Sequence, residues 1–305
     1  MRVVFMGTPD IAAMVLDSLI ASEHEVAAVV TQPDKPNARG NQITFSPVKK
    51  LAQEYKIPVL QPEKASSEES VAEIASYAPD IIVVAAYGQI LKSNLLELPK
   101  YRCINVHASL LPKYRGASPI QWAVINGEKY TGVSIMYMEK GLDTGDVICS
   151  EAIELAPDET AGSLHDRLGE LAGPVLLKAM DMIAKGTLNP VKQDDAQATY
   201  VPVLQKSMGE LDFNMSSEEL ERRIRGLIPW PGAYTHINGK LLKIWKAEVA
   251  EDIPAGLEPG KLRVVDRDEL YIGTKDGSLH IIELQLEGKK RMLASEFLKG
   301  FKVCQ

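Results

Sequence analysis

The 305-residue sequence contains only three cysteines, Cys103, Cys149 and Cys304, and their spacing matches no metal-ligand motif. An odd number of scattered cysteines argues against a disulfide framework and against a zinc site. No stretch approaches the roughly 18 consecutive apolar residues that a membrane-spanning helix needs. The apolar run at the N-terminus ends at Gly7 and is too short for the hydrophobic region of a signal peptide. These absences predict a cytoplasmic protein that has no disulfides, holds no metal and does not bind a membrane.

The sequence also lacks an excess of basic residues, since its formal net charge is −7. This value at first argues against a nucleic-acid partner, because phosphate contacts normally need basic surface. The negative charge is concentrated in the first part of the chain, however. From Ser207 onward, 15 Lys and Arg stand against 16 Asp and Glu. That region carries two basic clusters, at 222–225 and 289–291, so its composition is compatible with local basic patches.

A dinucleotide-binding fingerprint is missing as well. The segment after the first predicted strand has only Gly7 of the Gly-x-Gly-x-x-Gly pattern, and Pro9 interrupts the remainder. The sequence therefore predicts no NAD site. Gly7 and Pro9 instead predict a tight turn from a strand into a helix.

Short β-rich apolar runs alternate with helical patterns in the first part of the chain, which is typical of a doubly wound, mostly parallel sheet. The predicted strands are 3–6, 26–30, 57–60, 81–86 and 103–107, and the predicted helices are 11–20, 47–55, 67–77 and 119–125. Two later strands, 131–138 and 147–155, are expected to form an antiparallel pair. A long helix is predicted over 161–184, because Gly186 supplies a C-terminal stop.

A chain of this length is expected to hold two domains. The polar, proline-interrupted stretch 190–206 predicts a linker between a first domain at 1–189 and a second at 207–305. In the second domain, Ser216 and Glu219 form a capping-box pattern that begins a helix at 218–225. The pairs 238–239 and 276–277 (Asn-Gly and Asp-Gly) are hairpin signals between alternating apolar runs. The predicted fold of this domain is a small β-barrel.

One motif joins groups that suit acyl transfer. Asn105 and His107 lie two residues apart at the end of an apolar strand, so both side chains point to the same side. An amide can polarise a carbonyl oxygen, and an imidazole can move a proton. The turn 141–146 can supply the carboxylate, because its flanking glycines permit a tight conformation around Asp143. Each of these residues taken alone is more often structural, since polar residues at strand ends and in turns commonly bond the backbone.

Together these segments resemble the 10-formyltetrahydrofolate-dependent formyltransferase family. The resemblance rests on the Asn-x-His strand end, the Ser-Leu-Leu-Pro-x-x-Arg-Gly loop at 109–116 and the turn at 141–146, and it extends to 3–10, 31–34, 46–49, 229–231 and 242–247. It implies a Rossmann-like α/β catalytic domain followed by an OB-like β-barrel domain. The segments outside the catalytic core resemble the branch of the family that acts on charged initiator tRNA.

The resemblance implies an enzyme that transfers the formyl group of 10-formyltetrahydrofolate to the α-amino group of methionine on initiator tRNA, for translation initiation. Asn105, His107 and Asp143 would be its catalytic residues, with no covalent enzyme intermediate, no metal and no NAD. The folate would be held by the loop after the catalytic strand and by two other segments. These predicted folate-binding residues are Ser109, Leu110, Leu111, Pro112, Tyr87, Gly88, Leu91 and Gly141.

The same resemblance implies a contact with the tRNA acceptor stem. Arg39 matches the central arginine of a basic loop, and Lys35 lies in the same loop. Asn41 and Gln42 stand where lysines can occur, so the expected contact carries less charge than in more basic members. Lys206, at the end of the predicted linker, is a further candidate. A solvated surface loop is the simpler interpretation of the segment that holds Lys35 and Arg39. A solvated lysine is at least as good an interpretation of Lys206.

Two alternative functions remain open at the level of sequence. A formyltransferase that acts on a small amine would share the catalytic domain but would not need a barrel after Lys206. A noncatalytic protein that binds the tRNA acceptor end would be expected to have lost one of Asn105, His107 or Asp143, and all three are present. The protein is expected to be a monomer that binds folate and tRNA.

Overall fold

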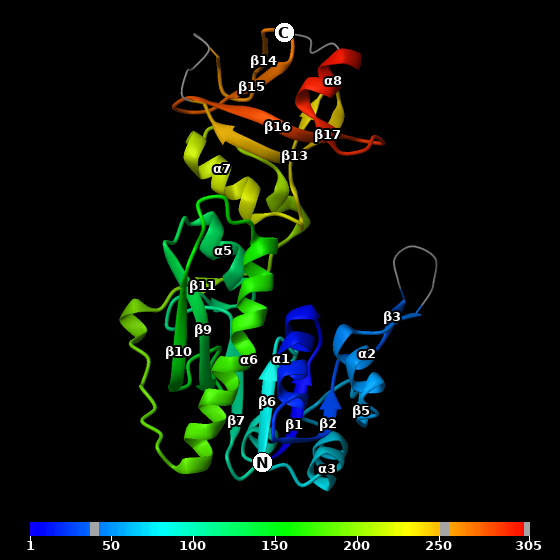
Figure 1. Cartoon of the computed structure of the whole chain (residues 1–305), viewed down its shortest axis with the longest axis vertical. Coiled ribbons are helices and arrows are strands. Elements are labelled where there is room, and N and C mark those ends of the chain that lie inside the picture. Colours follow the sequence, from blue (N-terminus) through cyan, green and yellow to red (C-terminus); the bar gives the residue numbers. More distant parts are fainter. Residues whose placement is uncertain (37–42, 251–256, 302–305) are drawn as a thin grey trace. The chain divides into compact units, whose positions relative to one another are not determined.

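The computed structural model describes residues 1–36, 43–250 and 257–301 (Figure 1). Packing of Cα atoms divides the chain into two units. Unit 1 comprises residues 1–116, 130–153 and 165–200, and unit 2 comprises 117–129, 154–164 and the chain from 201 onward. Most of the stretch interpreted from sequence as a linker therefore packs with unit 1.

Unit 1 is built on a seven-stranded sheet with the strand order β10-β9-β7-β6-β1-β2-β5. Its strands are β1 (Arg2–Gly7), β2 (Glu25–Val30), β5 (Val59–Leu60), β6 (Ile81–Ala85), β7 (Cys103–His107), β9 (Tyr130–Tyr137) and β10 (Val147–Glu154). The strands from β5 to β7 pair in parallel, and β7 pairs antiparallel with β9. The predicted mostly parallel sheet is confirmed.

The central strands are apolar on both faces because helices cover both sides of a parallel sheet. Val4 and Met6 of β1 belong to one buried cluster together with Ile74 and Leu95, which lie on two helices. Alternation along the strand turns Val3 and Phe5 to the opposite face, where they are also fully buried. Each such side chain contributes on the order of 1.5–3 kcal/mol when it leaves water.

The helices that accompany this sheet are α1 (Asp10–Ile20), α2 (Pro47–Glu54), α3 (Glu68–Ser76), α4 (Ser93–Leu96) and α6 (Ala161–Lys185). Ser46 and Ser67 cap the N-termini of α2 and α3 by accepting a hydrogen bond from a backbone N–H. The helix α6 approaches α1 closely at two glycines, since an added Cβ at Gly173 would lie 2.0 Å from the Ser18 hydroxyl. Positive φ at Gly186 ends α6 where the sequence predicted.

Short elements complete the chain around these layers. They are β3 (Lys35–Pro36), β4 (Ile43–Thr44), β8 (Arg115–Gly116), the 3-10 helix η1 (Asp195–Gln197), β11 (Tyr200–Val201) and the 3-10 helix η2 (Lys206–Gly209). The strands β3 and β4 pair antiparallel. None of these short elements was predicted, because so few residues carry no periodic signal.

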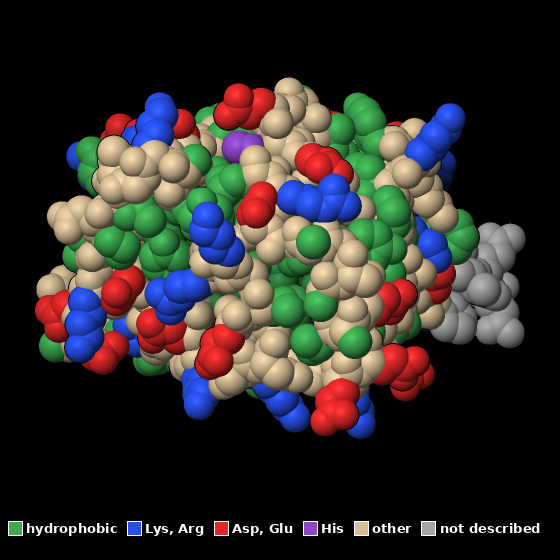
Figure 2. All heavy atoms as spheres, turned by 90° about the horizontal axis from the view of Figure 1, so that it is seen from below, with side chains coloured by type: hydrophobic (Ala, Val, Ile, Leu, Met, Phe, Trp, Pro, Cys, Tyr) green, Lys and Arg blue, Asp and Glu red, His purple; other side chains and the backbone are tan. Residues whose placement is uncertain are grey.

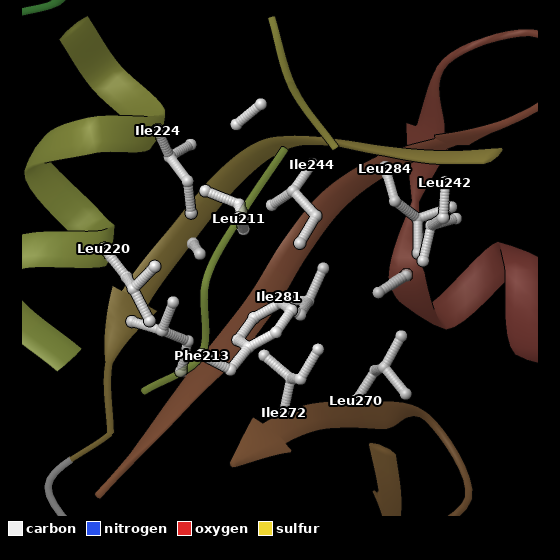
Figure 3. Close-up of a cluster of buried hydrophobic side chains, with 14 of the residues drawn as sticks. Leu211, Phe213, Leu220, Ile224, Leu242, Ile244, Leu270, Ile272, Ile281 and Leu284 are labelled. Carbon is white, nitrogen blue, oxygen red and sulfur yellow. The ribbon is translucent and has the colours of Figure 1, made fainter. Parts of the chain in front are cut away.

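Unit 2 contains an antiparallel sheet with the order β12-β13-β16-β15-β14, and β17 pairs with β16. Its elements are α5 (Pro119–Ile125), α7 (Ser217–Gly226), β12 (Ala233–Ile237), β13 (Lys240–Val249), β14 (Leu262–Val265), β15 (Glu269–Gly273), β16 (Ser278–Leu286), β17 (Met292–Leu293) and α8 (Ala294–Gly300). Alternate strand residues point into one core with Leu220 and Ile224 of α7 (Figure 3). The predicted capping box at Ser216 and Glu219 is present. An α/β part followed by an antiparallel β part confirms the predicted fold class.

On the face seen in Figure 2, Lys and Arg side chains are interspersed with Asp and Glu side chains. Within the described residues, no helix is both long enough and apolar enough to cross a membrane.

Candidate active site

Asn105 and His107 lie on β7, between the parallel strand β6 and the antiparallel strand β9. Because side chains alternate along a strand, both face the same side. His107 is the last residue of β7, at the carboxyl edge where open α/β sheets bind their ligands. The Asn105 side chain is half-buried and makes no hydrogen bond with the residues that the structure describes. Its N–H groups are therefore available to a ligand.

The His107 ring is buried and has a different neighbour at each nitrogen. Its Nε2 atom lies 2.9 Å from the Tyr114 carbonyl oxygen. A carbonyl oxygen only accepts hydrogen bonds, so Nε2 carries a hydrogen. Nδ1 lies 3.8 Å from Asp143 Oδ2, which is too long for a hydrogen bond but short enough for electrostatic interaction. Nδ1 is therefore the nitrogen that can exchange a proton, and it has a carboxylate beside it.

Asp143 lies in the turn that joins β9 to β10, and its conformation is unusual. Its φ angle is +53°, in the left-handed region that a residue other than glycine adopts at a cost of about 1–3 kcal/mol. The carboxylate is held by the Gly116 N–H, which donates to Oδ2 at 2.8 Å. Gly145 permits the turn to pass close to β9, since an added Cβ would lie 1.8 Å from the Tyr137 carbonyl oxygen. The close approach of the backbone therefore explains why a glycine is needed at position 145 of this turn.

The structure also distinguishes the two acids of the turn. Asp146 contributes its backbone carbonyl, which accepts a hydrogen bond from the Tyr137 N–H. Only the Asp143 carboxylate faces His107 among the described residues. Asp143 is therefore the member of this turn that can act together with the imidazole.

Gln193 is a site residue that sequence reasoning missed. Its side-chain amide donates to the Asp143 carbonyl at 2.8 Å and to the Gly145 carbonyl at 2.7 Å. The side chain is buried although it lies in the polar stretch that was interpreted as a linker. No signal in the sequence marked it, because its partners are about 50 residues away along the chain.

The predicted folate loop follows β7 and is fixed to β9. The Ser109 hydroxyl is buried and donates to the Lys113 carbonyl at 2.7 Å. Ser134 of β9 donates to the Ser109 carbonyl and accepts from the Leu111 N–H, at 2.7 and 3.1 Å. Ser134 is also directly opposite His107 in the strand register. The loop is therefore held by the residue of β9 that lies opposite His107, while Leu110 and Pro112 remain partly exposed.

The segment after β6 holds three more of the predicted folate-binding residues. The Tyr87 carbonyl accepts hydrogen bonds from Thr8 and Gln32, at 3.2 and 3.1 Å, which joins the ends of β1, β2 and β6. The Tyr87 and Leu91 side chains are buried in the hydrophobic cluster on one face of the sheet. Burial raises the pKa of Tyr87 to about 12, and its hydroxyl has no partner in the described residues. Gly88 has a φ of +88°.

The other predicted binding residues lie in separate places. Gly141 is exposed in the Asp143 turn, where an added Cβ would lie 2.2 Å from the Thr144 hydroxyl oxygen. Lys35 is exposed in β3 and pairs with Thr44. Lys206 is exposed in η2. Arg39, the central residue of the predicted tRNA loop, lies outside the described residues.

Within the residues that the structure describes, no group of three or more His, Cys, Asp and Glu side chains converges as metal ligands would.

Comparison with known proteins assigns both parts of the chain. Residues 1–180 match the family model described as formyl transferase, and residues 203–302 match the formyl transferase C-terminal domain. A methionyl-tRNA formyltransferase of Lachnospira eligens is 53% identical over 98% of this chain and 96% of its own length. A protein of the same name from Geobacter sulfurreducens is 49% identical over 99% of this chain and 95% of its own length.

Solved structures with low sequence identity share the fold. A sugar 3N-formyl transferase solved with dTDP and 5-N-formyl-THF aligns with a TM-score of 0.69 and 20% identity, over 95% of this chain and 99% of that chain. HypX from Aquifex aeolicus, solved with tetrahydrofolic acid, aligns with a TM-score of 0.65 and 19% identity over 98% of this chain. The chain spans only 48% of the length of HypX. From the family models and the close relatives, the chain belongs to the formyl transferase family, of which it has both the N-terminal and the C-terminal domain.

Proposed function

We propose that this protein is a methionyl-tRNA formyltransferase, which transfers the formyl group of 10-formyltetrahydrofolate to the α-amino group of methionine on initiator tRNA. The observation that carries the proposal is the similarity to relatives of that name over both domains, at 53% and 49% identity. The Asn105, His107 and Asp143 set provides the chemistry that such a transfer needs.

Asn105 is proposed to stabilise the negative charge that develops on the formyl oxygen. Its amide N–H groups have no partner in the described part of the chain, so a hydrogen bond to that oxygen displaces none. A donor that is already in place needs no reorganisation when the charge appears. The strand β7 keeps Asn105 in this place, because it pairs with β6 on one side and with β9 on the other.

His107 is proposed to move the proton. The bond between the formyl carbon and the methionine nitrogen forms as the bond to the folate nitrogen breaks, and one proton must pass from the first nitrogen to the second. Nδ1 is the free nitrogen of the ring, since Nε2 is bonded to the Tyr114 carbonyl. The Asp143 carboxylate, 3.8 Å from Nδ1, favours the positively charged ring that exists between the two transfers.

The folate is proposed to bind against the loop 109–112 and the segment 87–91. The loop backbone is fixed by Ser134 and adjoins His107 along the chain. The Tyr87 hydroxyl is buried without a partner in the described residues, which is costly unless a ligand or water supplies one. These features suit a flat ring with a polar edge, which a pterin presents.

A formylation assay tests the proposed function directly. The purified protein is given 10-formyltetrahydrofolate with charged initiator tRNA, charged elongator tRNA or free small amines in separate reactions. We expect formyl transfer to methionine on initiator tRNA, with weak transfer to the other acceptors. Transfer to small amines alone would assign the chain to the other branch of the family, and tRNA binding without any transfer would favour a noncatalytic role.

Arg39 is expected to serve tRNA positioning and not folate binding. Replacing Arg39 by alanine should lower kcat/KM for charged initiator tRNA and leave the affinity for a folate analogue unchanged, because a phosphate contact orients the acceptor without taking part in the chemistry. The slope of log Kd for tRNA against log salt should fall by about one. Kinetics and tRNA binding at several salt concentrations measure both effects.

Lys35→Ala is the control for the loop, since Lys35 is exposed at the end of the described part of the same loop. A smaller loss in Lys35→Ala than in Arg39→Ala identifies a specific contact. Equal losses of tRNA-dependent transfer and of slow folate hydrolysis without tRNA would show that Arg39 supports the fold or the folate pocket.

A further inference from the structure

Arg115 is a charged side chain with almost no access to solvent, and its environment needs an explanation. It is 1% exposed and is the largest of the fully buried side chains in the described residues. A buried guanidinium is stable only if hydrogen bonds and charge replace its water. Three side chains do so. Nε donates to Gln193 Oε1 at 3.0 Å, Nη1 to the Tyr200 hydroxyl at 2.9 Å and Nη2 to Asp195 Oδ1 at 2.8 Å.

These three partners all lie in the segment 193–200. Arg115 therefore attaches this segment to the predicted folate loop. Two backbone contacts strengthen the attachment, because the Arg115 N–H donates to the Thr199 carbonyl and the Tyr114 N–H donates to the Thr199 hydroxyl, both at 2.8 Å. The segment 193–200 carries little apolar side-chain surface and cannot be held by hydrophobic burial alone. Polar contacts hold it in place, and those of Arg115 are prominent among them.

The residues on either side of Arg115 contact the catalytic pair. The Tyr114 carbonyl accepts from His107 Nε2, and the Gly116 N–H donates to Asp143 Oδ2. Both of these residues have positive φ, +61° at Tyr114 and +110° at Gly116. Tyrosine rarely adopts that conformation unless the surroundings impose it. The anchored Arg115 side chain lies between these two residues and helps to hold the backbone in this conformation.

Gln193 extends the same network to the other side of the Asp143 turn. Its Oε1 accepts from Arg115, and its Nε2 donates to the carbonyls of Asp143 and Gly145. A side-chain amide has one acceptor atom and one nitrogen with two N–H groups, so every polar group of Gln193 is used. The turn is thus held at its carboxylate by Gly116 and at its backbone by Gln193.

We infer that Arg115 and Gln193 are positioning residues for catalysis, which fix the orientation of the His107 ring and of the Asp143 carboxylate through the backbone on both sides. Neither residue is assigned a contact with a substrate. The inference rests on the proposed function in one respect only, namely that the His107 and Asp143 pair is the catalytic pair.

The first test separates kcat from KM. We expect Arg115→Met and Gln193→Glu to lower kcat by about 100-fold, since a misplacement of about 1 Å in a catalytic group can cost that much. The KM values for folate and for charged tRNA should change little. Gln193→Glu keeps an acceptor for Arg115 but removes the donors to the turn, so it tests the link to Asp143 separately. Arg115→Lys should recover part of the activity, because lysine replaces the charge but not the fork of donors.

The second test asks whether Arg115 acts through the catalytic pair. In an Asp143→Ala background, adding Arg115→Met should cost little more, since residues that act as a unit are not additive. Amide hydrogen exchange gives a readout independent of activity, because the Gly116 N–H should lose protection in Arg115→Met while the amides of β1 and β6 keep theirs. If the wild-type protein formylates nothing, the proposed function fails, and the exchange at Gly116 still tests the positioning.

Arg2→Met is the matched control. Arg2 also belongs to unit 1 and bonds a backbone carbonyl, that of Tyr77 at 2.6 Å, together with the Glu25 carboxylate. Its loss should lower the melting temperature without a selective fall in kcat. The positioning role is overturned if Arg115→Met keeps a near-normal kcat or if the Gly116 amide stays protected from exchange. It is also overturned if the fall in kcat caused by Arg115→Met multiplies with the fall caused by Asp143→Ala.

Discussion

Replacement of Asn105 by alanine is expected to lower kcat by about 100- to 1,000-fold, as removal of one preorganised oxyanion donor does in other acyl-transfer sites. The loss should appear in kcat and not in KM, because the hydrogen bond strengthens only as charge builds on the formyl oxygen. The fold should persist, since the Asn105 amide has no protein partner among the described residues whose loss would destabilise it. Steady-state kinetics at varied folate and tRNA concentrations give kcat and KM separately, and calorimetry gives the affinity for folate.

Asn94→Ala provides the matched control for this variant. The Asn94 amide is also in unit 1 but donates to the Ser66 carbonyl at 3.1 Å, in a structural contact at the start of α4. We expect it to affect stability slightly and turnover hardly at all. A variant at Asn105 that bound folate normally and retained most of its turnover would remove this residue from the catalytic set.

Local signals explain why much of the fold was predictable. The observed limits of β7 and α5 are those predicted, because an apolar run bounded by turn residues fixes the strand and a proline at the first helical position fixes the helix. The Ser216 capping box and the hairpin at Asn238-Gly239 likewise depend on residues within four positions of each other. Such features need no knowledge of the tertiary structure.

Nonlocal contacts set the limit of the prediction. The segment 193–200 is polar and looks like a linker, yet Arg115 and Gln193 bury their side chains against each other. That pairing joins residues 78 positions apart, which no periodicity within the segment can reveal. The grouping of 117–129 and 154–164 with unit 2 is of the same kind.

The geometry of the candidate site was predictable to a similar extent. Asn105 and His107 share one strand, so their common direction followed from alternation. The proximity of Asp143 to His107 was expected from the glycine-flanked turn and from the resemblance, and the two side chains lie 3.8 Å apart. The tautomer could not be predicted, because it depends on the Tyr114 carbonyl, whose direction results from a positive φ that the sequence does not signal.

The pairing of His107 with Asp143 predicts the second large effect. Single replacements His107→Ala and Asp143→Ala are each expected to lower kcat by about 100- to 10,000-fold, the range that general acid–base groups commonly supply. The double variant should be little worse than the more damaged single variant, because the carboxylate acts through the ring and has nothing to support once the ring is gone. Single-turnover rates of the two single variants and of the double variant, compared with the wild type, form a double-mutant cycle that measures how far the two residues act together.

Asp143→Asn and Asp146→Asn separate the charge from the shape of the turn. Both replacements remove one negative charge from the same turn, and Asp143→Asn keeps an oxygen that can accept from the Gly116 N–H. If the charge beside Nδ1 is what matters, Asp143→Asn should lose most of the activity lost by Asp143→Ala, whereas Asp146→Asn should stay close to the wild type. Two outcomes would contradict this pairing: falls in kcat at His107 and Asp143 that multiply in the double variant, or a fully active Asp143→Asn. Either would mean that the carboxylate only shapes the turn and that His107 moves the proton without it.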